Sequence, residues 1–151
     1  MLSPMRSRRI LHPTDLSRAS GRAFAKAVEL AKDSRAELVL LHVYAMPVQM
    51  MGEAYTPPAA YAQMEASTRR AAQKRLDALI ARARQAGVRA RALLVEGTPH
   101  VRIARAARSY RADAIVMGTH GRTGLARAFL GSVAARVLAS APCPVVTVRG
   151  A

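Results

Sequence analysis

Hydrophobic positions in this chain form short continuous runs, which alternate with longer segments where apolar residues recur every three or four positions. The run Leu38–Leu41 is apolar along its whole length, as is typical of a strand covered on both faces. Residues 17–34 instead predict an amphipathic helix with Phe24, Ala27 and Ala31 on one face. Because such runs and segments alternate, we predict an α/β fold with an open parallel sheet.

The same periodicities predict five strands and four helices. Strands are expected at 9–12, 37–44, 89–96, 114–117 and 145–148, and helices at 17–34, 60–85, 99–110 and 133–140. Thr98 is a predicted N-cap with Pro99 at the first helical position, and Ser132 is a predicted N-cap for the last helix. No internal repeat is long enough for two domains, so we expect residues 1–151 to form one. The pattern alone leaves the strand order open.

The candidate chemistry lies after the fourth predicted strand. Gly118-Thr119-His120-Gly121 follows that strand, and nine residues later Gly131-Ser132 precedes a helix. Glycine lets the backbone approach a ligand closely, and a helix N-terminus offers unpaired N–H groups and a positive dipole end. Arg122 lies between the glycines and adds positive charge. This order predicts a phosphate-binding loop.

The spacing Gly118-x-x-Gly121, nine residues, then Gly131-Ser132 resembles the ATP-binding signature of the universal stress protein family. Further landmarks occur in the expected order, from about residue 8 to residue 148: Pro13-Thr14-Asp15, Gly97-Thr98-Pro99 and Pro142-Cys143-Pro144-Val145. The resemblance implies a Rossmann-like fold of the adenine nucleotide alpha hydrolase type. Its five-stranded parallel sheet would have the order 3-2-1-4-5, with helices on both faces.

In such a sheet the ligand lies at the carboxyl ends of strands 1 and 4, where the strand order reverses. The resemblance implies that backbone groups around Pro13, Thr14 and Val43 hold adenine. Asp15 would accept hydrogen bonds from the ribose hydroxyls, although it can also cap the first helix. The ribose would be bordered by Met117 and Gly118.

The resemblance also implies an ATP phosphate site, with or without Mg²⁺. Its residues would be Gly121, Arg122, Gly131, Ser132 and Val133. Many ATP-binding members have a hydroxyl residue at the position of Ala134, so this chain lacks one potential phosphate contact. The four histidines do not pair at ligand spacing and the chain has one cysteine, so we expect no metal site made by protein side chains alone.

The formal net charge of +15 at pH 7 would suit a polyanion. The basic residues are spread over several predicted helices, however, and few aromatic residues are available for base stacking. We therefore expect a solvated basic surface rather than a nucleic-acid-binding one. The apolar edge strand Val145, Val146, Thr147 and Val148 predicts pairing with a second copy, a homodimer that the resemblance also implies.

Localisation is expected to be cytoplasmic, with no membrane segment. One cysteine excludes an internal disulfide, and no apolar run approaches the roughly 18 residues of a membrane span. Residues 1–7 are expected to form a basic tail, and the apolar segment after it is too short for a signal peptide and is interrupted by Pro13. Residues 45–58 contain three prolines and one glycine and predict a long flexible loop, which is either a flap near the ligand or a disordered insertion.

The resemblance therefore implies an ATP-binding, cytosolic stress-response switch or sensor. It has no P-loop, no kinase motif set and no GxSxG elbow, so we do not predict an enzyme. Two alternatives remain open. One is a slow ATPase or autophosphorylating enzyme, and the other is a basic nucleic-acid-binding module.

Overall fold

A five-stranded parallel sheet forms the centre of the molecule, seen in a computed structural model that describes residues 8–46, 57–120 and 130–150. The strands are β1 (Arg9–Pro13), β2 (Glu37–Tyr44), β3 (Ala90–Glu96), β4 (Ala114–Gly118) and β5 (Val145–Val148). Their order is β3-β2-β1-β4-β5, and every neighbouring pair is parallel. This confirms the fold class and the strand order that the resemblance implied.

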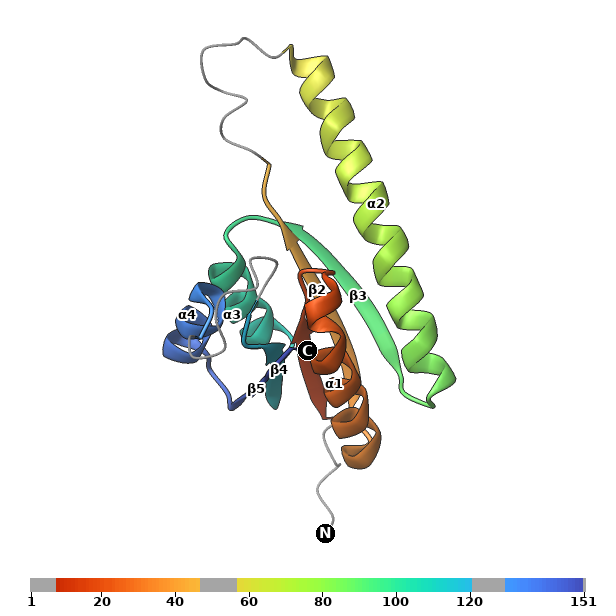
Figure 1. Cartoon of the computed structure of the whole chain (residues 1–151), viewed down its shortest axis with the longest axis vertical. Helices are drawn as coiled ribbons and strands as arrows, with labels where there is room; N and C mark the ends of the chain where they lie inside the picture. The colour runs from red at the N-terminus through yellow and green to blue at the C-terminus, as the bar shows by residue number, and fades with distance from the viewer. Residues whose placement is uncertain (1–7, 47–56, 121–129, 151) are drawn as a thin grey trace.

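Helices cover both faces of the sheet (Figure 1). α1 (Gly21–Ser34), preceded by the short 3-10 helix η1 (Arg18–Ser20), and α2 (Pro58–Gln85) pack on one face. α3 (Pro99–Ser109) and α4 (Ser132–Ser140) pack on the other. The described chain thus has three layers, as expected when strands are buried on both sides.

The apolar run in β2 supplies both cores at once. Leu38 and Leu40 pack in the cluster with α1 and α2, whereas Val39 and Leu41 pack in the cluster with α3 and α4. Because successive side chains of a strand point to opposite faces, a strand between two helix layers must be apolar at every position. This explains why the sequence shows a continuous run here rather than an alternation.

Two predicted helix starts are wrong. Gly131, not Ser132, is the N-cap of α4, because its backbone is extended (φ −60°, ψ 154°) and its N–H donates to Thr119 O at 2.6 Å. α2 begins at Pro58 rather than at residue 60, since proline at the first helical position lacks only an N–H that would have no helical partner.

The first helix also departs from the prediction. The chain turns through η1 after Ser17 before α1 begins at Gly21. The predicted tail 1–7 and most of the predicted loop 45–58 lie outside the described residues.

The long helix α2 extends past the sheet at its N-terminal end (Figure 1). Its buried residues are Ala72, Leu76, Ile80 and Ala83, all in its second half. Its first half is joined to the end of β2 by polar contacts instead. The Tyr44 hydroxyl donates to Glu65 Oε1 at 3.2 Å and accepts from Arg69 at 2.6 Å. No helix among the described residues is both long enough and apolar enough to cross a membrane.

Candidate functional site

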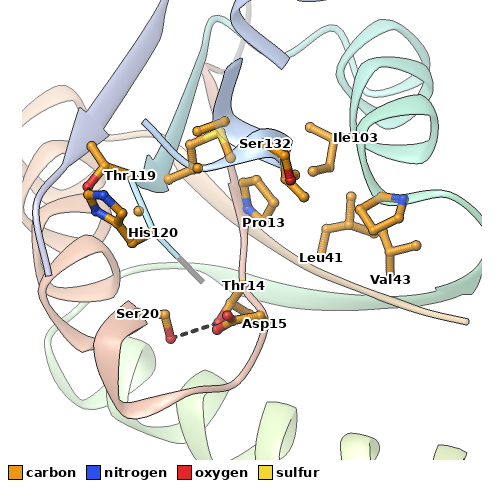
Figure 2. Close-up of a pocket in the computed structure, with 16 residues that line it drawn as sticks. Pro13, Thr14, Asp15, Ser20, Leu41, Val43, Ile103, Thr119, His120 and Ser132 are labelled. Carbon is orange, nitrogen blue, oxygen red and sulfur yellow. Dashed lines mark hydrogen bonds between the residues drawn. The ribbon is translucent and has the colours of Figure 1, made fainter. Parts of the chain in front are cut away.

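A cavity of about 400 Å³ lies at the carboxyl ends of β1 and β4, where the strand order reverses. Figure 2 shows Leu41, Val43 and Ile103 together on one side, and Thr119 and His120 on the other. The full lining is Pro13, Thr14, Asp15, Ser20, Leu41, Val43, Pro99, Ile103, Met117, Gly118, Thr119, His120, Gly131, Ser132, Val133 and Ala134.

The turn after β1 forms the floor of this cavity and is held by its own side chains. Thr14 Oγ1 accepts from the N–H of Leu16 at 3.0 Å, and Asp15 Oδ1 accepts from the N–H of Ser17 at 2.9 Å. Leu16 has a positive φ of 64°, which a leucine adopts only when its surroundings require it. Asp15 therefore stabilises the turn before η1 and does not cap a helix, because the N-caps of η1 and α1 are Ser17 and Ser20. Its role toward a ribose stays a prediction.

The apolar side of the cavity lies along the end of β2, where the backbone of β2 continues past the last residue of β1. Leu41 O accepts from the N–H of Thr14 at 2.8 Å, so the backbone groups of Leu41 face β1, and Tyr44 O accepts from Gly97 N on the β3 side. Because these directions alternate along a parallel strand, the N–H and C=O of Val43 face the side of β1, beyond its end at Pro13. A flat base with edge donors and acceptors would match this wall.

The polar side of the cavity contains the N-terminus of α4. The first helical hydrogen bond joins Ala135 N to Gly131 O at 2.9 Å, so the N–H groups of residues 132–134 precede the helical ladder. These residues line the cavity and give it a positive dipole end. A Cβ at Gly131 would lie 2.7 Å from Thr119 O, which is why only glycine fits there. This end of the cavity is suited to an anion.

Comparison with known proteins gives the family of this chain. A model of the universal stress protein family matches residues 6–149. The chain therefore belongs to the universal stress protein family. It is 38% identical to a universal stress protein of Thermus aquaticus over 141 residues, 93% of this chain and 97% of that one. It is 36% identical to one from Methanocaldococcus jannaschii over 144 residues, 94% of this chain and 82% of that one.

Known structures of universal stress proteins share this fold. A family member from Burkholderia pseudomallei is 32% identical, with a TM-score of 0.75 over 98% of this chain and 100% of that one. A universal stress protein in complex with cAMP aligns with a TM-score of 0.68 at 24% identity, over 96% of this chain and 98% of that one. The Archaeoglobus fulgidus protein in complex with dAMP aligns with a TM-score of 0.61 at 21% identity, over 97% and 100% of the chains.

In this universal stress protein, nine of the eleven predicted site residues line the one cavity. They are Pro13, Thr14, Asp15, Val43, Met117, Gly118, Gly131, Ser132 and Val133. The other two, Gly121 and Arg122, lie outside the described residues. Two segments about 100 residues apart in the sequence thus line the same cavity.

Sequence reasoning did not assign a site role to Ser20, Leu41, Pro99, Ile103 or Thr119, which also line the cavity. A signal existed for Leu41 and Pro99, because the end of β2 and the start of α3 lie at the same edge of a parallel sheet as the ends of β1 and β4. Ile103 follows from Pro99, since it lies one helical turn further along α3. Ser20 had no signal, because its place depends on the short η1 turn.

Three histidines of the universal stress protein surround the same edge, each with a different partner. His42 Nδ1 donates to Thr14 O at 2.8 Å, and His12 Nδ1 donates to Val116 O at 2.8 Å. His120 Nδ1 lies 2.8 Å from Thr119 Oγ1, and its buried Nε2 has no hydrogen-bond partner in the described chain. Across the described residues, no three His, Cys, Asp or Glu side chains come close enough together to hold a metal ion.

Proposed function

We propose that this universal stress protein binds an adenine nucleotide, with ATP as the first candidate, and acts as a cytosolic stress-response switch. The observation that carries the proposal is the convergence of nine predicted site residues on one cavity. The described part of that cavity combines an apolar slot at Val43 and Ile103, a carboxylate at Asp15 and the N-terminus of α4. These features match a base, a ribose and a phosphate in turn.

Related structures support the same ligand class. The universal stress proteins described in complex with cAMP and with dAMP both hold an adenine nucleotide. Their identity to this chain is low, so they support the fold's capacity for such ligands rather than the choice of ATP. Because the α4 N-terminus offers N–H groups at three successive residues, we propose that a polyphosphate binds better than a monophosphate.

Isothermal titration calorimetry with ATP, ADP, AMP and cAMP tests this proposal. We expect ATP to bind to the wild type and Gly131→Val to lose binding, since any Cβ at this position meets Thr119 O. Gly21→Ala is the matched control, because a Cβ there meets nothing within 4 Å. If none of the four nucleotides bound to the wild type, or if Gly131→Val bound ATP with wild-type affinity, the assignment of this cavity as the nucleotide site would be wrong.

We also propose that binding, rather than turnover, is the activity of this protein. One observation favours the second candidate, a slow ATPase or autophosphorylating enzyme: Thr119 Oγ1 lies 2.8 Å from His120 Nδ1, so a hydroxyl has a base beside it at the phosphate end. Incubation with terminally labelled ATP separates the two candidates. Label released as phosphate, or transferred to wild type but not to Thr119→Val, would favour the enzyme.

A homodimer through β5 is part of the proposal. β5 is an edge strand in the described sheet, and its side chains Val145, Val146 and Val148 are only partly buried. Pairing of two such edges about a two-fold axis would satisfy their backbone groups. Light scattering should give twice the monomer mass at micromolar concentration, and Val146→Lys should shift that mass toward the monomer.

A further inference from the structure

β1 pairs unequally with its two neighbours. It pairs with β2 at five residues, Arg9 to Pro13, but with β4 only at Ile10 and Leu11. If the β1–β4 register continued, the carbonyl of Val116 would accept its ladder hydrogen bond from the N–H of residue 13. Residue 13 is proline and has no N–H. The ladder must therefore stop here, and the cavity opens directly beyond this point.

A side chain takes the place of the missing donor. His12 Nδ1 lies 2.8 Å from Val116 O. Since a carbonyl oxygen can only accept, Nδ1 carries the proton and Nε2 of the neutral ring does not. Nε2 has no hydrogen-bond partner in the described structure, so this one bond to Val116 O orients the ring.

The surroundings of His12 hold the ring neutral and in place. The side chain is completely buried, and its ring lies 6.0 Å from the ring of Phe24 in α1. Burial lowers the pKa of His12 to about 4, against smaller opposing effects of the Val116 carbonyl and Asp15. A neutral imidazole with a single tautomer is therefore a spacer of constant shape at neutral pH.

We propose that His12 is a positioning residue of the nucleotide site, which sets the separation of the carboxyl ends of β1 and β4 through its bond to Val116 O. This inference rests on the proposed function of the cavity. His12 itself does not line the cavity, but the residues that follow the two bonded positions do: Pro13 after His12, and Met117 and Gly118 after Val116. A change in this one bond would therefore move the lining residues that follow β1 relative to those at the end of β4.

The competing explanation is that His12 only fills the core beside Phe24. The two explanations differ in what a substitution does to the folded protein. A core-filling residue affects stability alone, whereas a positioning residue also affects the affinity of the folded fraction. The replacement must therefore separate the hydrogen-bond donor from the volume.

His12→Asn and His12→Leu form such a pair, because both side chains have four heavy atoms with a branch at Cγ and only asparagine can place a donor where Nδ1 lies. Leu76→Ala is the control for destabilisation, since Leu76 is fully buried in the core between α2 and the sheet, outside the cavity lining. ATP affinity is measured by calorimetry under conditions where urea curves show each variant folded. We expect Asn to bind within about threefold of wild type, Leu to bind about tenfold more weakly, and Leu76→Ala to bind as wild type.

Equal affinity of His12→Leu and Leu76→Ala would overturn the proposal, as would an Asn variant as weak as the Leu variant. If His12→Leu does not fold, long-range ¹H–¹⁵N spectra of the wild-type imidazole decide instead. We expect the His12 ring to be protonated at Nδ1 and unprotonated at Nε2, and the opposite tautomer would overturn the proposal. Failure of the wild type to bind any adenine nucleotide would overturn the proposed function, whereas wild-type binding that His12→Leu retains would overturn only the role of His12.

Discussion

The two sides of β1 differ although one strand makes both. Toward β2 the ladder runs through five residues and is extended by the bond from Thr14 N–H to Leu41 O. Toward β4 it stops after two residues, and a histidine side chain replaces the next hydrogen bond. We call the longer ladder toward β2 the closed side of β1 and the interrupted ladder toward β4 its open side, although residues from the ends of all three strands line the cavity. The candidate site is therefore formed where a regular sheet is interrupted, not where extra structure is added to it.

The largest expected effect is the change in the free energy of unfolding with pH that His12 causes on the open side. The pKa of His12 is about 4 in the folded protein and 6.5 ordinarily, so the unfolded chain binds the proton first as pH falls. The free energy of unfolding should therefore decrease on acidification, by about 3 kcal/mol between pH 7 and pH 4. Urea unfolding of wild type and His12→Asn at both pH values measures this contribution as a difference. Parallel pH dependence of the two proteins would mean that His12 is not buried neutral.

On the closed side, His42 should contribute less to the free energy of unfolding than His12 does. His42→Leu leaves Thr14 O without its imidazole donor, which should lower the free energy of unfolding by about 1–2 kcal/mol. Asparagine at this position keeps a donor near Nδ1 and serves as the control. Urea unfolding at pH 7 gives both values. If Leu and Asn destabilised equally, the bond to Thr14 O would have no separate contribution.

The amino ends of the strands on the closed side should matter still less. Glu37 in β2 lies 2.9 Å from Arg91 in β3 and 3.6 Å from Arg9 in β1, and both arginines are partly exposed. Glu37→Gln should therefore lower the free energy of unfolding by only about 0.5 kcal/mol, and added salt should reduce the difference. Thermal unfolding at low and high ionic strength measures it. A loss of several kcal/mol would show that the closed side depends on these charges.

The smallest change in stability is expected at Gly118, at the end of the open side. A Cβ there would make only ordinary contacts, the nearest being His120 O at 3.5 Å, so Gly118→Ala should unfold within about 0.5 kcal/mol of wild type. If a nucleotide packs against this backbone, its affinity should nevertheless fall about tenfold in calorimetry. Unchanged affinity would show that the ligand does not approach Gly118 closely.

Much of this architecture could be predicted from local patterns. The apolar run at 38–41 indicated a strand buried on both faces, and the spacing from Gly118 to Ser132 indicated residues that line the polar side of the cavity. The strand order required the family resemblance, because periodicity carries no information on which strands are neighbours. Which cavity residues bind a ligand stays a prediction.

The features that escaped prediction depend on register. Nothing local to His12 indicates a partner 104 positions away at Val116, and the importance of Pro13 appears only when the missing donor is matched to that carbonyl. The N-cap at Gly131 was missed for a similar reason, since its extended backbone is held by Thr119 O from another segment. Propensity favoured the adjacent serine, and a long-range hydrogen bond decided otherwise.

The first half of α2 extends beyond the sheet, so the displacement caused by a small tilt of this helix would be largest at its N-terminal end. Its first deeply buried residue is Ala72, so the 14 positions from Pro58 to that point extend about 21 Å along the axis. A tilt of about 10° around Ala72 would displace Pro58 by about 4 Å, while atoms near Ala72 would hardly move. Tyr44, Glu65 and Arg69 brace that arm against the end of β2. Loss of these contacts would therefore let a small change in the tilt of α2 become a much larger displacement at its first residues.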